Sequence, residues 1–323
     1  MKPTDRPQPS FLMIGETVVD LISSGIVSSL ADANTFQRFP GGEVSNLSMN
    51  LARMGYPTAL AGCVGEDGFG DFLKTKLKAA GVNLDLLQTT RQAPTTLVPV
   101  ARQTETPDFI IYRGADKYLR LNEELRSAVD GCRVFHTSAG SLAHNPGRTT
   151  ILELLKMAAE KDKLLSLDPN YHPRIWPDRT DFVPFLKDIL SLITVAKPSL
   201  DDSVRIFGTG YEAEDYLEAF LDLGVQIVAL TMGRKGVLLG TRDGLRVHLE
   251  AHPISVVDVT GAGDAFWSGL LTGLLEGMGP ERAARLGQAI AEYKIGVLGP
   301  IQEFPERDYF LKQAGAVSQG EAL

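Results

Sequence analysis

Asp258-Val-Thr-Gly-Ala-Gly-Asp-Ala-Phe266 is the stretch from which the fold of this 323-residue chain is most directly inferred. It follows an apolar segment, 253–257, whose composition predicts a strand, and it leads into AFWSGLLTGLLEG (265–277), whose apolar spacing predicts a helix. A strand that turns through glycines into a helix is a building unit of α/β proteins.

Gly261, Ala262 and Gly263 place three consecutive backbone N–H groups at the start of that helix. The positive end of the helix dipole lies there and favours anions, so the turn is predicted to cradle phosphate. Asp264 lies in the same turn. An isolated aspartate there is often only a helix cap, but the flanking glycines let a ligand approach the backbone, which favours a base that takes a hydroxyl proton during phosphoryl transfer.

The central part of the chain alternates short apolar segments with helical patterns. The apolar segments are RVFHTSA (133–139), KLLSLDPN (163–170), ITVAKPS (193–199), QIVALTMG (226–233) and VLLG (237–240), and the helices are expected at about 147–161, 180–191 and 212–223. Strands separated by single helices indicate a doubly wound α/β fold, with a mostly parallel sheet and helices on both faces.

Two earlier apolar segments, 95–103 and 108–114, flank Thr104-Glu105-Thr106-Pro107 and predict a β-hairpin. They do not fit the strand–helix series. We therefore interpret segments of about 16–40 and 94–118 as a small β lid inserted into one α/β core.

The composition is that of an ordinary globular protein, with 44% apolar and 22% charged residues. No repeat or low-complexity linker divides the sequence, so we expect one domain over 1–323 with a disordered tail at 315–323. The 32 basic and 40 acidic residues give a net charge of −8, and the basic residues form no long run. Nucleic acid is therefore disfavoured as a partner.

Cys63 and Cys132 lie in apolar contexts without CxxC spacing, which predicts buried, reduced thiols. The first residues are polar and proline-rich, and no run of about 18 apolar residues occurs. Secretion and membrane insertion are thus disfavoured, and a cytoplasmic location is expected.

DVTGAGDAF resembles the C-terminal signature D-T-x-G-A-G-D-x-F of the ribokinase-like (PfkB-type) carbohydrate kinases. Gly41-Gly-Glu-Val-Ser-Asn46 resembles the N-terminal G-G-x-x-x-N element of that family, and Gly65-Glu-Asp-Gly-Phe-Gly70 resembles its G-x-D-x-x-G element. The similarity extends over essentially the whole chain, and it implies the family's fold.

The resemblance implies a sugar site near the N-terminus. Gly15-Glu-Thr-Val-Val-Asp20 matches an opening G-E-x-x-x-D whose aspartate accepts hydrogen bonds from sugar hydroxyls, so Asp20 is a predicted ligand. Gly41 and Gly42 are expected to let the sugar lie against the backbone, with Asn46 as a hydrogen-bonding partner. A plain turn followed by a helix cap is the alternative interpretation of these residues.

Phe109-Ile-Ile-Tyr-Arg-Gly-Ala-Asp116 on the lid resembles F-Y-R-x-x-A-D of fructokinases and 2-keto-3-deoxygluconate kinases. This likeness implies that Tyr112 and Arg113 reach the sugar. The alternative is a half-exposed lid strand with its arginine on the solvent side.

Asp168 and Asn170 match the family's D-x-N-x-R and are predicted substrate ligands. His172 stands where the arginine is usual, and Arg174 is displaced by two positions. Because a carboxylate is best held by two arginines, the histidine favours a neutral sugar over a sugar acid.

Thr231-Met-Gly-Arg-Lys-Gly236 resembles the family's T-x-G-x-x-G nucleotide segment, so Thr231, Gly233 and Gly236 are predicted ATP contacts. Gln288 occupies the position of an asparagine on the adenine side.

Two metal sites follow from the resemblance. Asp258, with backbone near 297–299, implies a site for a monovalent cation, expected to be K⁺. The family's N-x-x-E element corresponds to Ser199 and Asp202, and Asp202 is expected to hold Mg²⁺ through water, since Mg²⁺ binds mainly to nucleotide phosphates.

These features predict an ATP-dependent sugar kinase that acts on a ketohexose such as fructose, with a 2-keto-3-deoxygluconate or other sugar-acid kinase as the alternative. A silent sugar-binding regulatory relative would be expected to lose Asp264 or the glycines, and a dinucleotide oxidoreductase would need an opening G-x-G-x-x-G, which this chain lacks. The apolar lid strands also predict a homodimer joined through the lid.

Overall fold

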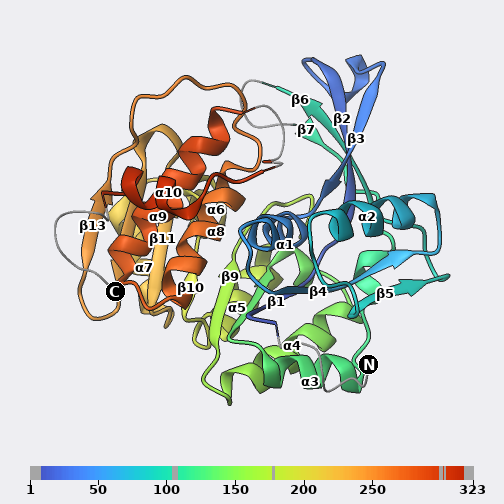
Figure 1. The fold of residues 1–323 in the computed structure, drawn as a ribbon, viewed down its shortest axis with the longest axis horizontal. Coiled ribbons are helices and arrows are strands. Elements are labelled where there is room, and N and C mark those ends of the chain that lie inside the picture. Colours follow the sequence, from blue (N-terminus) through green and yellow to red (C-terminus); the bar gives the residue numbers. More distant parts are fainter. Residues whose placement is uncertain (1–8, 104–107, 177–178, 298–300, 302, 316–323) are drawn as a thin grey trace. The chain divides into compact units, whose positions relative to one another are not determined.

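The computed structural model describes residues 9–103, 108–176, 179–297, 301 and 303–315. The contacts among residues divide the chain into two units. Figure 1 labels their helices and strands. Unit 1 comprises the described residues within Met1–Met49, Pro57–Lys163 and Tyr171–Arg179, and unit 2 those within Asn50–Tyr56, Leu164–Asn170 and Thr180–Leu323. The expectation of one domain over 1–323 stays a prediction, and residues 316–323 of the expected tail lie outside the described part.

In unit 1, four strands pair in parallel in the order β8, β1, β4, β5. Their bounds are Val134–Ser138, Phe11–Ile14, Thr58–Gly65 and Leu87–Thr90. Every residue of β1 and β4 is buried, as expected for strands covered on both sides.

The segments interpreted as a lid form a second sheet of unit 1, in the order β3, β2, β6, β7, and we keep the name lid for this sheet. These strands span Phe36–Gly41, Val18–Ile26, Leu97–Arg102 and Asp108–Phe109. The antiparallel pairing of β6 with β7 confirms the predicted hairpin, whose connection at 104–107 lies outside the described residues. Four large apolar side chains of this lid are between 41% and 64% exposed: Ile26, Phe36, Ile110 and Tyr112.

In unit 2, five strands pair in the order β13, β12, β11, β10, β9. They span Arg246–Leu249, Val237–Thr241, Ile227–Thr231, Val195–Ala196 and Leu164–Asp168. β9, β10 and β11 run parallel, whereas β12 and β13 are antiparallel to their neighbours. The expected mostly parallel sheet is thus confirmed, with an antiparallel edge.

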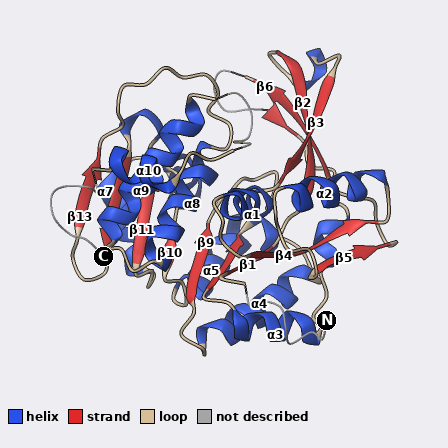
Figure 2. Cartoon of the chain, viewed as in Figure 1, coloured by secondary structure: helices blue, strands red, loops and turns tan. Residues whose placement is uncertain are grey.

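Helices lie beside the strands of both units (Figure 2). Unit 1 holds α2 (Gly68–Ala79), α3 (Glu123–Gly131) and α4 (Gly147–Ala159), and α1 (Glu43–Arg53) contributes to both units. Unit 2 holds α5 (Arg179–Leu190), α6 (Leu200–Phe207), α7 (Ala213–Asp222), α8 (Ala262–Leu275), α9 (Pro280–Ile295) and α10 (Arg307–Gln313). α4, α5 and α7 confirm the three predicted helices to within about two residues. Within the described ranges, none of the helices has the length and apolar character needed to cross a membrane.

Small residues hold α8 close to α9. A Cβ on Gly269 would lie 2.6 Å from the Cα of Gly287, and one on Gly273 would lie 2.8 Å from the Cα of Ala283. Such distances are too short for a side chain, so the two helices pack backbone to backbone. This packing fixes the helix that begins with the glycine-rich turn.

The prediction of a strand at 253–257 is wrong. The segment is irregular, and three of its side chains, Ile254, Val256 and Val257, are between 39% and 53% exposed. Composition favours extended backbone but supplies no pairing partner, and β13, formed by earlier residues, takes the place beside β12. The N–H groups of Val257 and Asp258 instead donate to the Ile295 carbonyl, at 2.9 and 3.2 Å.

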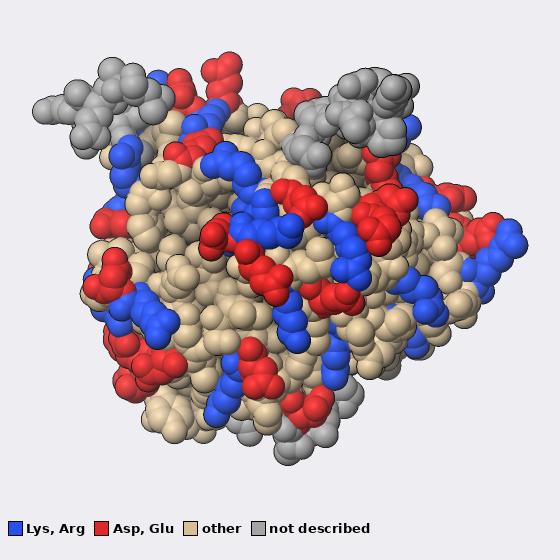
Figure 3. Space-filling model, turned by 90° about the horizontal axis from the view of Figure 1, so that it is seen from below, with Lys and Arg blue, Asp and Glu red and all other residues tan. Residues whose placement is uncertain are grey.

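Cys63 and Cys132 are both buried and form no disulfide, as predicted. Burial raises the pKa of each thiol to about 11. On the face in Figure 3, basic and acidic side chains are interspersed rather than gathered by sign, in agreement with the sequence pattern.

Candidate active site

The glycine-rich turn forms the N-terminus of α8. Gly261 caps the helix with φ of +78°, in the left-handed region that favours glycine, and Asp264 lies half-buried in the first turn. The Ala262 N–H donates to the Val259 carbonyl at 3.1 Å. One of the three predicted cradle donors is therefore engaged within the turn itself.

Two lysines lie beside the cradle glycines. A Cβ on Gly263 would be 3.6 Å from Lys197 Nζ, and one on Gly261 would be 3.9 Å from Lys294 Cε. These are ordinary van der Waals separations, so the protein itself does not press on either glycine. The turn thus combines a helix N-terminus with two nearby lysine side chains.

Lys197 follows β10 and is only 5% exposed. Its Nζ lies 2.9 Å from Asp168 Oδ2 and 5.9 Å from the Trp267 ring centroid. Asp168 ends β9, and its Oδ1 accepts a hydrogen bond of 3.2 Å from the N–H of Asn170, which adopts φ of +31°. The two predicted substrate ligands Asp168 and Asn170 are therefore joined to each other, and Asp168 holds the lysine next to the cradle.

Asp202 closes a capping box at the start of α6. Its Oδ2 accepts from the N–H and the hydroxyl of Ser199, at 3.1 and 2.6 Å. Burial, and then the charge of Asp168, raise the pKa of Asp202 to about 6. Two carboxylates therefore share this buried corner, and Lys197 offsets only part of their negative charge.

Asp258 meets a buried ammonium group. Lys294 Nζ donates to the Asp258 carbonyl at 3.0 Å and to Asp258 Oδ2 and the Val297 carbonyl at 3.4 Å each. Residues 298–299 of the predicted cation loop lie outside the described part of the chain.

The predicted nucleotide segment lies at the end of β11. Gly233 and Gly236 adopt φ of +57° and +84°, and a Cβ on Gly236 would overlap the Leu249 carbonyl. Thr231 pairs with Ser199 in an isolated parallel bridge, so this segment adjoins the start of α6.

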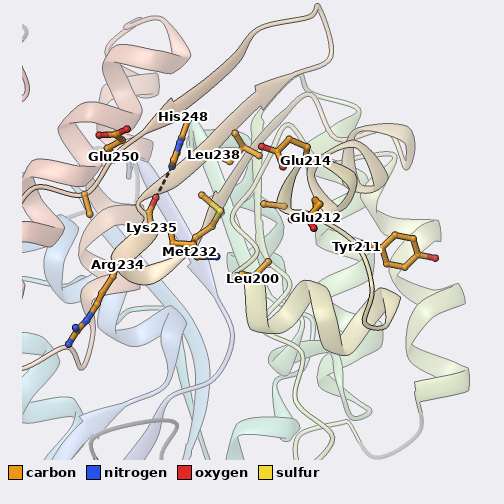
Figure 4. Close-up of a pocket in the computed structure, with 12 residues that line it drawn as sticks. Leu200, Tyr211, Glu212, Glu214, Met232, Arg234, Lys235, Leu238, His248 and Glu250 are labelled. Carbon is orange, nitrogen blue, oxygen red and sulfur yellow. Dashed lines mark hydrogen bonds between the residues drawn. The ribbon is translucent and has the colours of Figure 1, made fainter.

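A cavity of about 560 Å³ opens beside this segment. Figure 4 shows Leu200, Met232 and Leu238 within it, Tyr211 at one edge and Arg234 toward the other. The His248 ring nitrogen lies 2.7 Å from the Lys235 carbonyl and fixes the turn.

Gln288 lies on α9 and is 8% exposed. Its amide donates to the Glu250 carbonyl at 2.6 Å and to Glu292 Oε1 at 3.0 Å. The predicted adenine-side residue is thus engaged in holding the chain that follows β13.

The predicted sugar ligands Asp20, Gly41, Gly42 and Asn46 come together in unit 1. A Cβ on Gly41 would overlap the Asp20 carboxylate, so only glycine leaves room for that side chain. Gly42 adopts φ of +90°, and its carbonyl accepts from the Asn46 N–H at 2.9 Å.

The lid residues differ from one another. Tyr112 is 62% exposed, while its backbone pairs with Leu97. Arg113 instead forms an ion pair with the buried Asp116, which also accepts from the Thr96 hydroxyl. Arg113 is thus anchored within unit 1.

Arg174 fastens the lid strand β7. Its guanidinium lies 2.6 Å from Asp108 Oδ1 and 2.5 Å from the Phe109 carbonyl, and the hydrogen bond from Arg174 holds the pKa of Asp108 below its usual value. The His172 ring lies 4.7 Å from the Phe109 ring. Both residues that depart from D-x-N-x-R therefore contact the lid.

Glu16 supports the turn at Gly41 and Gly42, and no role was predicted for it from the sequence. It is 8% exposed and accepts hydrogen bonds from the hydroxyls of Ser138 and Ser141, while a Cβ on Gly42 would lie 2.7 Å from its carbonyl. Lys197 and Lys294 were also missed. All three are charged residues within otherwise apolar or motif-like stretches, which is the signal that could have identified them.

Comparison with known proteins identifies the family of the chain. The model of the pfkB family carbohydrate kinases matches residues 8–307. The chain belongs to this family. As a pfkB kinase it is a phosphotransferase that acts on a sugar hydroxyl, and it has the ribokinase-like α/β fold.

Individual relatives cover most of this pfkB kinase. It is 33% identical over 305 residues to an ATP-dependent 6-phosphofructokinase of Thermoanaerobacterium thermosaccharolyticum, and the alignment covers 94% of this chain and 93% of the relative. The fructokinase of Halothermothrix orenii is 34% identical, with a TM-score of 0.77 over 90% of this chain and 99% of that one. The sugar kinase PH1459 of Pyrococcus horikoshii, solved in complex with ATP, is 25% identical, with a TM-score of 0.80 over 94% and 99%.

Proposed function

We propose that this pfkB kinase transfers the γ-phosphoryl group of ATP to a hydroxyl of a neutral ketohexose such as fructose. The observation that carries the proposal is the pairing of Arg113 with Asp116 and of Arg174 with Asp108. Binding of an acidic sugar favours unpaired guanidinium groups that grip its anion in bidentate fashion. Both arginines that the sequence places near the substrate are already held by carboxylates.

ATP as the donor is supported by the names of relatives. One is called ATP-dependent, and the Pyrococcus horikoshii kinase was crystallised with ATP. Thr231, Gly233 and Gly236 are the proposed nucleotide contacts in this chain, with Gln288 acting through its hold on Glu250.

Asp264 is the proposed base. It lies in the first turn of α8, where the helix dipole favours its ionised form and where phosphate charge is also stabilised. As the sugar hydroxyl attacks the γ-phosphorus, its proton passes to the Asp264 carboxylate and the bond to the β-phosphate oxygen breaks.

Gly261, Gly263 and Lys197 are proposed to stabilise the transferred group. The glycines supply N–H groups at the helix terminus, and the ammonium of Lys197 lies beside Gly263. Lys197 is buried and paired with Asp168, so its position is set before the nucleotide binds. Such preorganised charge stabilises a transition state without further rearrangement.

The buried corner at Asp202 fits Mg²⁺. Burial, and then the charge of Asp168, raise the Asp202 pKa to about 6, and a divalent cation nearby would stabilise the ionised carboxylates. Asp202 would hold the ion through water, with nucleotide phosphates as its main ligands. When bound, the ion neutralises phosphate charge.

Asp20, Gly41, Gly42 and Asn46 are the proposed sugar contacts, with Tyr112 and Arg113 nearby on the lid. Asp20 would accept hydrogen bonds from sugar hydroxyls, and the Asn46 amide can both donate and accept hydrogen bonds. Closing of the lid over the sugar would exclude water that otherwise hydrolyses ATP.

A coupled ADP-release assay tests the substrate. The panel is fructose, fructose 6-phosphate, 2-keto-3-deoxygluconate and ribose, and we expect the highest kcat/KM with fructose. Fructose 6-phosphate is the second candidate, because the 6-phosphofructokinase is a relative at 33% identity. A higher kcat/KM for either anionic substrate would overturn the argument from the paired arginines.

We further propose a homodimer joined through the lid. The exposed apolar side chains of the lid, Ile26, Phe36, Ile110 and Tyr112, are more than a thin, four-stranded sheet can bury alone. Light scattering tests it: the chain mass is 35.0 kDa, so a dimer gives twice that value. Ile110→Lys or Val98→Asp should then reduce the measured mass, whereas a wild-type mass near 35.0 kDa contradicts the dimer.

A further inference from the structure

Lys294 is a buried ammonium in the place where family resemblance predicts a free cation. The residue is 2% exposed and lies in the last turn of α9. An isolated ammonium in such a position is costly, so its partners have to match its charge and its three donors.

The partners of Lys294 are the predicted cation ligands. Its Nζ lies 3.0 Å from the Asp258 carbonyl, 3.4 Å from Asp258 Oδ2 and 3.4 Å from the Val297 carbonyl. Two carbonyl oxygens and one carboxylate oxygen form the hard oxygen set that a monovalent cation would use. A K⁺ ion at the centre of these three atoms would displace the ammonium, so the described residues do not fit K⁺ together with Lys294 in this position.

The lysine also reaches the phosphate cradle. Its Cε lies 3.9 Å from the position of a Cβ on Gly261, the residue that caps α8. The loop itself is tied to α9 by the hydrogen bonds from Val257 and Asp258 to the Ile295 carbonyl. The ammonium therefore links the end of α9 to the start of α8.

The position suits a fixed charge for two reasons. The C-terminal end of α9 is the negative end of its dipole, which stabilises a lysine in the last turn. The Asp258 carboxylate, with its side chain 16% exposed, supplies the counter-charge. The net charge of the pair is close to that of an Asp258–K⁺ pair.

We propose that Lys294 takes the place of the monovalent cation and orders the anion cradle from behind, so that the enzyme works without K⁺. This replaces the expectation, implied by the resemblance, that K⁺ occupies a site at Asp258. It depends on the proposed function only for its activity readout.

The first experiment uses wild-type protein. Thermal unfolding is compared in KCl and in tetramethylammonium chloride at equal ionic strength, without sugar or nucleotide, and kcat is then measured in the same two salts. We expect the same Tm and a kcat that differs by less than about twofold, since no ion-binding free energy is added. A higher Tm in KCl, or stimulation of kcat by about fivefold or more, would overturn the proposal.

The second experiment removes the ammonium. In tetramethylammonium, Lys294→Ala is expected to lower kcat by about tenfold or more through loss of cradle order, and KCl or methylammonium should restore part of that loss. The same salts should raise its Tm. Lys312→Ala, an exposed lysine on α10, is the matched control and should behave as wild type.

Lys294→Met keeps the buried stem and serves if the alanine variant does not fold. Full activity of either variant in tetramethylammonium contradicts the proposal. The proposal is also contradicted if no added cation changes the Tm or the kcat of Lys294→Ala, because the site then stays empty. The Tm readouts require neither substrate, so a wrong sugar or nucleotide assignment would leave them intact and appear only in the ADP-release assay.

Discussion

The proposed sugar half, with Gly41 and Gly42, and the proposed phosphate half, with Gly261 and Gly263, differ in what surrounds their glycines. At Gly41 a Cβ would overlap the Asp20 carboxylate, and at Gly42 it would lie 2.7 Å from the Glu16 carbonyl. At Gly261 and Gly263 it would meet only lysine atoms at 3.9 and 3.6 Å. Packing within the protein requires glycine at positions 41 and 42. At 261 the positive φ requires it, and only at 263 does glycine serve solely to leave open space beside the helix start.

Asp264→Asn is expected to have the largest effect, because it removes the base from the phosphate half and leaves the helix start intact. Turnover should fall by about 10³-fold or more, with little change in Tm. Steady-state ADP release measures it. Near-normal kcat would remove Asp264 from the mechanism.

Gly263→Ala sharpens the contrast directly. The methyl group fits the unliganded protein but intrudes on the phosphoryl group, so kcat should fall by about 10²-fold while the unfolding free energy changes by less than about 1 kcal/mol. Urea unfolding and kinetics give the two numbers. A loss of stability as large as the loss of activity would mean that the protein, not the ligand, needs this glycine.

Asp202→Asn tests the ionisation of the buried carboxylate in the phosphate half. Because the native pKa is raised from 3.8 to about 6, the folded state holds the proton more tightly than the unfolded chain. As pH rises from about 4 to 6, the wild type therefore loses stability, whereas Asp202→Asn does not. Relative to wild type, the variant should gain up to about 3 kcal/mol of unfolding free energy across that range.

Urea unfolding at pH 4, 5, 6 and 7, without nucleotide, measures the difference. Asp201→Asn, an exposed neighbour in the same helix turn, is the matched control and should show no such trend. A pH-independent difference between Asp202→Asn and wild type would contradict the raised pKa.

Gly41→Ala should have the smallest effect of the four, and it acts first on the fold. The methyl group displaces the Asp20 carboxylate, so the protein should lose about 1–2 kcal/mol of stability. KM for the sugar should rise while kcat changes little, since Asp264 is untouched. A lower kcat at unchanged KM and stability would break the comparison between the two halves.

The order of elements and the glycine-rich turn were predictable because both are local in sequence. Apolar segments separated by helical patterns gave the parallel strands β9 to β11, and the glycines of the Gly261–Asp264 turn marked the start of a helix. It was not predictable that β13, and not 253–257, pairs with β12, since strand pairing depends on partners distant from the segment itself.

The roles of buried charges were harder to predict. Lys197 and Lys294 gain their roles through aspartate partners that lie 29 and 36 positions away in the sequence. Likewise, the displaced Arg174 proved to hold β7, a contact that no motif encodes. Sequence motifs name residue types, whereas the pairing that decides their use arises from the fold.

The two buried thiols have a practical consequence. With pKa values of about 11, Cys63 and Cys132 carry little thiolate at neutral pH and are shielded from reagents in water. A cysteine introduced by Gln37→Cys, at an exposed position of β3, would therefore react with a maleimide dye far faster than either native one. The natural chain is thus a ready background for fluorescence labelling of the lid, without prior removal of its own cysteines.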